Sequence, residues 1–207
     1  MIKISTSILS SKNRIESIIK LNNSNSDYLH IDVMDGIFVP NTQMKIEEIE
    51  EFETISKKPL DVHLMTVNPE MYIDNLKNKN IEYITIHIEI DKNINDIISK
   101  IKTLGYKVGI SIKPNTKTEC LIPYLDKIDL VLIMSVEPGF GGQEFLPNSL
   151  EKVQEIRKMK EDITIEIDGG IKDTNIDEIK KYVDIAVVGS YIINSQDYNQ
   201  AINDLKN

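Results

Sequence analysis

Residues 29–41 read LHIDVMDGIFVPN, and their alternating pattern predicts a β-strand with two very different faces. One face carries three apolar side chains: Leu29, Ile31 and Val33. The other face carries two possible metal ligands and a methionine: His30, Asp32 and Met34. Such a polar face is either exposed to water, as in many antiparallel sheets, or forms one wall of a buried metal site. The rest of the chain distinguishes between these two interpretations.

Strand-like runs alternate with helical patterns along the whole chain. Eight runs predict strands: residues 2–9, 28–34, 60–65, 81–89, 106–112, 128–136, 162–168 and 183–189. The clearest helical stripe lies in residues 94–104, and Gly105 follows it as a stop signal. Asn68 and Pro69 form a start signal with Asn68 as the cap. The weakest predicted helix lies in residues 114–125.

Eight strand–helix units of roughly 26 residues each predict one (β/α)8 barrel domain over residues 1–207. Its active site is expected at the C-terminal ends of the strands. A doubly wound open sheet is the alternative, but it often has a glycine-rich turn after the first strand. Residues 9–12 read LSSK instead, so the barrel is favoured.

In a parallel barrel the helices cover the outside, so the apolar parity of each strand faces outward. The opposite parity then fills the interior with polar side chains: Ser5, Ser7, His30, Asp32, Asp61, His63, Thr85, His87, Glu89, Glu166 and Asp168. All three histidines of the chain fall on these inward positions. Buried carboxylates and imidazoles need partners, and a metal ion would supply them.

The net charge of −9 and the pI of about 4.9 argue against a nucleic-acid partner, which requires a basic surface. A small phosphate ester remains possible, because backbone N–H groups can hold it. The single Cys120 excludes an intrachain disulfide and fits a reducing compartment. We see no signal peptide and no apolar run of membrane length, so we expect a cytoplasmic protein without a membrane partner.

Five motifs resemble, in order and spacing, the ribulose-phosphate 3-epimerase family: HIDVMDGIFVPN (30–41), DVHLM (61–65), EPGFGGQEF (137–145), IDGGI (167–171) and VVGS (187–190). The resemblance covers nearly the whole chain. It implies a (β/α)8 barrel that interconverts D-ribulose 5-phosphate and D-xylulose 5-phosphate in the pentose phosphate pathway. It also implies a homo-oligomer.

The resemblance further implies roles for individual residues. The ligands of one divalent ion (Zn, Fe, Mn or Co) would be His30, Asp32, His63 and Asp168. The catalytic acid/base pair would be Asp32 and Asp168. Methionines around the reacting centre would be Met34, Met65 and Met134. Substrate contacts would be Ser7, His63, Gly139, Phe140, Gly141, Gly142, Gly169, Gly170, Gly189 and Ser190. The family's pattern does not assign His87 to the metal, so we expect it to support the ligands from behind or to belong to the core, and the same holds for Glu89 and Glu166.

Two positions depart from the family's usual sequence. Ser5 and Thr6 precede Ser7, where Ala-Pro is usual, and Ile37 follows Gly36, where a long polar residue is common. Neither departure touches a proposed ligand.

The implied chemistry explains why these residue types occur together. Epimerisation at C3 removes a proton beside a carbonyl and returns one to the other face, so two carboxylates on opposite sides avoid turning the intermediate. A divalent ion stabilises the enediolate as a Lewis acid. Thioethers are apolar and offer no competing proton. Glycines allow close approach to phosphate, and the glycine-rich loop 139–145 is a candidate lid.

Other interpretations remain open. The two aspartates can be buried ion-pair partners, the methionines core residues, and the glycines plain turn residues. At the level of function, the alternatives are an epimerase of hexulose 6-phosphates such as allulose 6-phosphate, a metal-independent lyase or decarboxylase, and a non-catalytic barrel that binds a sugar phosphate.

Overall fold

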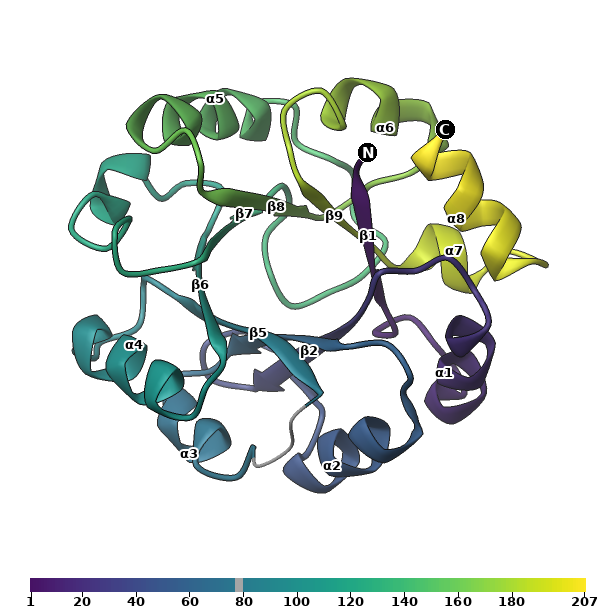
Figure 1. The fold of residues 1–207 in the computed structure, drawn as a ribbon, viewed down its shortest axis with the longest axis horizontal. Helices are drawn as coiled ribbons and strands as arrows, with labels where there is room; N and C mark the ends of the chain where they lie inside the picture. The colour runs from purple at the N-terminus through teal and green to yellow at the C-terminus, as the bar shows by residue number, and fades with distance from the viewer. Residues whose placement is uncertain (77–79) are drawn as a thin grey trace.

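A computed structural model describes residues 1–76 and 80–207 of the chain. In this part, eight parallel strands form the barrel: β1 (Lys3–Ser7), β2 (Tyr28–Asp35), β4 (Leu60–Met65), β5 (Ile81–His87), β6 (Lys107–Ile112), β7 (Leu130–Met134), β8 (Thr164–Asp168) and β9 (Ile185–Val188). Each strand pairs with the next in this order, and β9 pairs with β1, which closes the ring (Figure 1). The predicted (β/α)8 barrel is confirmed, and the open sheet is excluded.

Helices surround the ring (Figure 1): α1 (Arg14–Asn22), α2 (Ile46–Ile55), α3 (Pro69–Ile73), α4 (Ile94–Thr103), α5 (Ser149–Met159), α6 (Asp173–Ile179), α7 (Ser190–Ile193) and α8 (Tyr198–Lys206). The weak prediction for residues 114–125 resolves into a short 3-10 helix, η1 (Thr118–Leu121). A strand of two residues, β3 (Thr42–Gln43), pairs antiparallel with the end of β2 and was not predicted. Among the described residues, no helix is both long and apolar enough to cross a membrane.

The predicted helix boundaries are largely correct. Gly105 follows α4 with φ +88°, a backbone region that glycine adopts without steric cost. Pro69 occupies the first position of α3, as expected. Asn68 is the N-cap residue of α3, as expected, although its side chain makes no capping hydrogen bond.

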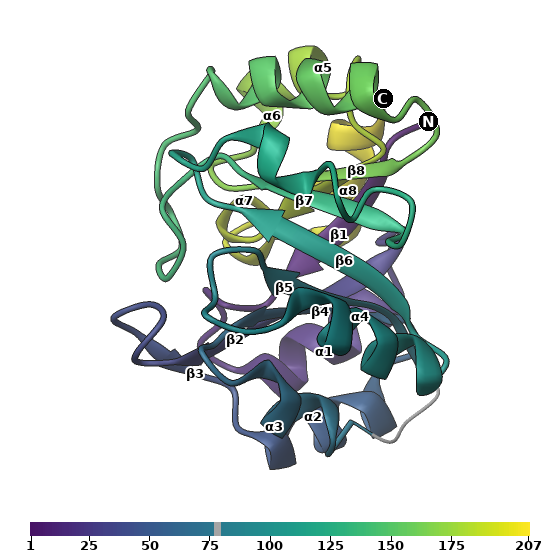
Figure 2. The ribbon, with the colours of Figure 1, turned by 90° about the vertical axis from the view of Figure 1, so that its left-hand side faces the viewer.

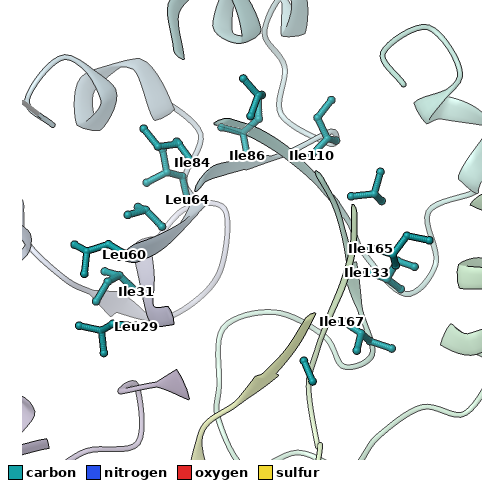
Figure 3. Close-up of a cluster of buried hydrophobic side chains, with 14 of the residues drawn as sticks. Leu29, Ile31, Leu60, Leu64, Ile84, Ile86, Ile110, Ile133, Ile165 and Ile167 are labelled. Atoms are coloured by element: carbon teal, nitrogen blue, oxygen red, sulfur yellow. The ribbon is translucent and has the colours of Figure 1, made fainter. Parts of the chain in front are cut away.

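The parity prediction is confirmed for the outer face of the barrel. Leu29, Ile31 and Val33 are at most 1% exposed and pack between the sheet and the helices. Equivalent residues on the other strands join them in one apolar layer, and Figure 3 shows these side chains pointing away from the barrel axis. This layer leaves the opposite face of every strand to fill the interior.

The barrel interior is apolar at one end and polar at the other. At the N-terminal end, the rings of Tyr28 and Tyr83 meet edge to face with centroids 5.8 Å apart. Leu130 and Ile185 belong to the same buried cluster and fill the space beside them. Because side chains fill this end, the polar residues further along the strands can be reached only from the C-terminal ends of the strands.

Ile86→Ala tests the outward apolar layer. Ile86 is fully buried, so its truncation should lower the free energy of unfolding by about 2–5 kcal/mol. Ile122 is 56% exposed, and Ile122→Ala should change it by less than about 0.5 kcal/mol. Guanidinium unfolding followed by circular dichroism measures both values. Equal effects of the two substitutions would contradict the assigned parity.

Candidate active site

Four ligand-type side chains converge at the C-terminal ends of β2, β4 and β8. One nitrogen or oxygen atom from each of His30, Asp32, His63 and Asp168 lies within 4.8 Å of the others. Asp32 is the common neighbour, because its Oδ1 lies 3.4 Å from His30 Nε2 and 3.7 Å from His63 Nδ1. Ser7 donates a hydrogen bond of 2.7 Å to the other oxygen of Asp32. The structure thus brings together the four residues that the sequence suggested as ligands.

Two buried nitrogen atoms in this cluster fit a cation. His30 Nε2 and His63 Nδ1 are inaccessible to solvent and have no hydrogen-bond partner. Both rings are fully buried, so water does not satisfy these atoms. Two imidazole nitrogens and two carboxylates form a donor set typical of Zn²⁺, Fe²⁺, Mn²⁺ or Co²⁺. The residues present could therefore hold one divalent ion.

A buried carboxylate orients His30. His30 Nδ1 lies 2.7 Å from Asp61 Oδ2, and Ser5 donates a 2.7 Å hydrogen bond to the same oxygen. An ionised carboxylate only accepts, so the proton sits on His30 Nδ1 and Nε2 faces the cluster. Ser5, one of the departures from the family's usual sequence, thus supports this carboxylate. Glu166 lies beside Asp61, and burial together with that charge raises its pKa well above the ordinary value.

The two aspartates have opposite electrostatic environments. Burial disfavours charge on Asp32, but the nearby His30 and His63 outweigh it and lower the pKa of Asp32. Burial also disfavours a charged His30, yet Asp61 and Asp32 raise the pKa of His30 well above 6.5. At Asp168, burial and the charge of Asp32 act together and raise the pKa to about 7. Near neutral pH, Asp32 is therefore a carboxylate in the metal-free site, whereas Asp168 readily binds a proton.

A pocket opens above the cluster. Asp32 and Asp168 form its base. It is also lined by the three predicted methionines and by every predicted substrate contact except His63: Ser7, Met34, Met65, Met134, Gly139, Phe140, Gly141, Gly142, Gly169, Gly170, Gly189 and Ser190. His30 and His63 lie behind Asp32 and are fully buried.

Sequence reasoning missed seven lining residues: Leu9, Ser10, Val136, Pro138, Gln143, Ile171 and Val187. Each lies at a strand's C-terminal end or in the loop that follows it, close in sequence to a residue that was predicted. Position relative to the strand ends was the signal that could have found them.

The glycine loops form the rim of the pocket. Gly170 has φ +64°, and a Cβ there would lie 2.3 Å from the backbone nitrogen of Phe145, so the loops after β7 and β8 are in direct contact. Gly139 has φ +119°, and its carbonyl accepts a 3.0 Å hydrogen bond from Asn41 Nδ2. Figure 2 shows the loops after β2 and β7 projecting from the same end of the barrel. Three loops therefore enclose one site.

Comparison with known proteins agrees with this geometry. The model of the ribulose-phosphate 3-epimerase family matches residues 3–193. The chain is 39% identical to the ribulose-phosphate 3-epimerase of Helicobacter pylori (strain J99), over 99% of this chain and 97% of that protein. It is 36% identical to the ribulose-phosphate 3-epimerase of Bacillus subtilis (strain 168), over 100% and 99%. The chain belongs to the ribulose-phosphate 3-epimerase family.

Membership in the ribulose-phosphate 3-epimerase family confirms the resemblance and makes the chain an enzyme of the isomerase class. Solved structures that share the fold are more distant. KGPDC from Streptococcus mutans has a TM-score of 0.76 at 12% identity, covering 100% of this chain and 96% of that one. A 3-hexulose-6-phosphate synthase has a TM-score of 0.72 at 14% identity, covering 99% and 98%. At these identities the likeness supports the fold alone.

Zinc affinity should depend steeply on pH. A metal needs His30 with a bare Nε2 and an ionised Asp168, but the metal-free chain protonates His30 at neutral pH and Asp168 below about pH 7. A proton then competes with the ion, so affinity should fall by at least about tenfold per pH unit from pH 7 to 6. Calorimetric titration in buffers of different ionisation enthalpy measures the affinity and the protons released. A constant affinity without proton release would contradict the assigned protonation states.

Proposed function

We propose that this member of the family interconverts D-ribulose 5-phosphate and D-xylulose 5-phosphate by two-base proton transfer at C3, as in the pentose phosphate pathway. One observation carries the proposal: two carboxylates with separated pKa values lie beside two unpartnered imidazole nitrogens at the base of a glycine-rimmed pocket. The Helicobacter pylori and Bacillus subtilis relatives are both named ribulose-phosphate 3-epimerase, which supports this reaction.

We propose that His30, Asp32, His63 and Asp168 hold one divalent ion. The orphaned His30 Nε2 and His63 Nδ1 support this assignment, since a buried polar nitrogen without a partner is costly. When bound, such an ion acts as a Lewis acid that lowers the cost of placing negative charge beside the substrate carbonyl.

Asp32 and Asp168 are the proposed acid/base pair. They project from β2 and β8, which are separated by β9 and β1 on the shorter way around the ring, so they approach the pocket from different sides. Asp32 can accept the C3 proton on one side, while a protonated Asp168 delivers one to the other face. The roles exchange in the reverse direction. Ser7 donates to Asp32 Oδ2 and so fixes the orientation of this carboxylate.

The phosphate end of the substrate is proposed to lie against the glycine loops after β7, β8 and β9. No lysine or arginine occurs among the described residues that line the pocket. Neutral donors must then hold the phosphate, namely backbone N–H groups and the hydroxyl of Ser190. Barrels often hold phosphate at the loops after their last two strands, and Gly170, Gly189 and Ser190 lie there.

Met34, Met65 and Met134 are proposed to shield the reacting carbon. Each is at most 2% exposed and lines the pocket next to the carboxylates. Thioethers exclude water without offering a proton, which protects a carbanion-like intermediate from side reactions.

We also propose that residues 1–207 act as one domain and that the enzyme is a homo-oligomer. Light scattering after size-exclusion chromatography would test the oligomeric state.

A hexulose 6-phosphate epimerase would share the carboxylates and the ion, so substrate choice needs its own experiment. Metal-loaded enzyme should turn over D-ribulose 5-phosphate with a higher kcat/KM than allulose 6-phosphate. The reverse order would assign the protein to the hexulose reaction.

Proton exchange tests the two-base scheme. In deuterated water, product formed from D-ribulose 5-phosphate should carry deuterium at C3, detected by NMR. Asp32→Asn and Asp168→Asn remove the only proposed proton carriers, so each should lower kcat by at least about 100-fold. Metal removal by a chelator should abolish turnover, and added Zn²⁺ or Mn²⁺ should restore it. Full activity of either asparagine variant would eliminate the scheme.

The loop 139–145 is proposed to close over bound substrate. Residues 139–143 of this loop line the pocket, and Phe140 is 56% exposed. Substrate should slow limited chymotrypsin cleavage after Phe140, measured by mass spectrometry. Equal cleavage rates with and without substrate would argue against a lid.

A further inference from the structure

The proposed function leaves His87 without a role, although it lies directly beside His63. Its ring is fully buried, and its Nε2 lies 2.9 Å from His63 Nε2. On the other side, its Nδ1 lies 3.0 Å from Glu89 Oε2. The two imidazoles stack with centroids 4.9 Å apart. We call this series of side chains the His63–His87–Glu89 relay.

The first contact of the relay contains one proton. Two ring nitrogens 2.9 Å apart form a hydrogen bond only if one carries N–H and the other presents a lone pair. Two arrangements are possible: either His63 donates to His87, or His87 donates to His63. They have opposite consequences, because the first leaves His63 Nδ1 bare and the second places a proton on it.

Glu89 selects between the two arrangements. Its Oε1 accepts hydrogen bonds from the backbone N–H of Lys113 at 2.7 Å and from the hydroxyl of Thr116. A carboxylate held by two donors acts as an acceptor at its other oxygen, so His87 Nδ1 carries the proton that points to Oε2. A neutral His87 then presents a bare Nε2, which accepts from His63 Nε2–H. His63 Nδ1 is therefore the free lone pair that faces Asp32.

We propose that Glu89 and His87 are positioning residues that hold His63 in the tautomer whose Nδ1 can bind the cation. The inference rests on the proposed function, because it gives His63 a cation to bind. Asp61 orients His30 directly at 2.7 Å. His63 Nε2 instead contacts a second imidazole, so the fixed charge that orients it lies one residue further away, on Glu89.

The two histidines of the relay are shielded from competing partners. The ring of Phe38 lies 4.6 Å from the ring of His87, and Lys113 Nζ lies 3.9 Å above the Phe38 ring. Asp35 fixes the loop that carries Phe38, since its Oδ1 accepts from the Phe38 backbone N–H at 2.8 Å and its Oδ2 from the Val67 N–H at 2.7 Å. With His87 covered in this way, water does not offer an alternative partner that would relax the tautomer.

Glu89→Gln should reverse the direction of the hydrogen bonds in the relay, with little change in the shape of the side chain. The glutamine oxygen keeps the donors from Lys113 and Thr116, so its NH2 group faces His87 Nδ1. An amide only donates there, which moves the protons along the relay and places one on His63 Nδ1. Zinc affinity, measured by competition with a chromophoric chelator, should fall about 10–100-fold. Glu82→Gln is the matched control, because Glu82 lies at the other end of β5 in a surface ion pair with Lys107.

Nitrogen-15 NMR reads the tautomers directly, and the chain has only three histidines to assign. The relay predicts a proton on His63 Nε2 in the wild-type chain, with or without zinc, and its transfer to Nδ1 in metal-free Glu89→Gln. Wild-type zinc affinity in Glu89→Gln, or a wild-type His63 that lacks the Nε2 proton, would overturn the relay. If the wild-type chain binds no zinc, the proposed metal site fails, while the tautomer of His63 in the metal-free chain still decides the relay. Unchanged melting temperatures of both variants would exclude a general loss of structure.

Discussion

The structure depends on one constraint, namely that charged and polar groups enclosed by an apolar barrel need partners. Outward-facing isoleucines, leucines and valines bind the helices to the sheet, and the same alternation commits histidines and carboxylates to the interior. Most of these groups satisfy one another, as Ser5, Asp61 and His30 do. The buried atoms without a hydrogen-bond partner include His30 Nε2 and His63 Nδ1, and both lie close to Asp32, which lines the pocket. The alternation of apolar and polar side chains along the strands thus determines both the stability of the barrel and the position of the site.

The interior is organised to orient two imidazoles in different ways. His30 receives its orientation directly from Asp61, its register partner on the neighbouring strand β4. His63 receives its orientation sideways, through His87, from a carboxylate beyond the end of β5. Both routes end on a carboxylate that also accepts hydrogen bonds from other groups of the barrel or its loops. This arrangement gives a role to buried acids and histidines of this chain beyond the four proposed ligands.

Much of this structure was readable from the sequence, because parity and position along a strand decide which way a side chain faces. The eight strands, the inward ligands and the glycine loops followed from period-2 alternation, from βα repetition and from the family motifs. The stripe of Ile46, Ile49 and Phe52 could have indicated α2 in the same way. The short pairing of β3 with β2 could not, since it involves only two residues at a strand end.

The relay was beyond the reach of sequence reasoning for a physical reason. Alternation placed His63 and His87 on the inward face, but their contact depends on the register of β4 against β5, where His63 pairs with Thr85. Glu89 lies past the end of its strand, where parity no longer predicts direction. Asp35, in the motif of residues 30–41, orders the following loop by accepting hydrogen bonds from backbone N–H groups. No pattern in the sequence indicates this role. Tertiary contacts of this kind have no local signal.

The convergence of four side chains on one cation is the central claim, and anomalous diffraction at the zinc edge tests it most directly. Crystals of zinc-loaded protein should show one strong peak bonded to His30 Nε2, His63 Nδ1 and one oxygen each of Asp32 and Asp168. A peak elsewhere in the molecule, or no peak in this cluster at saturating zinc, would contradict the account.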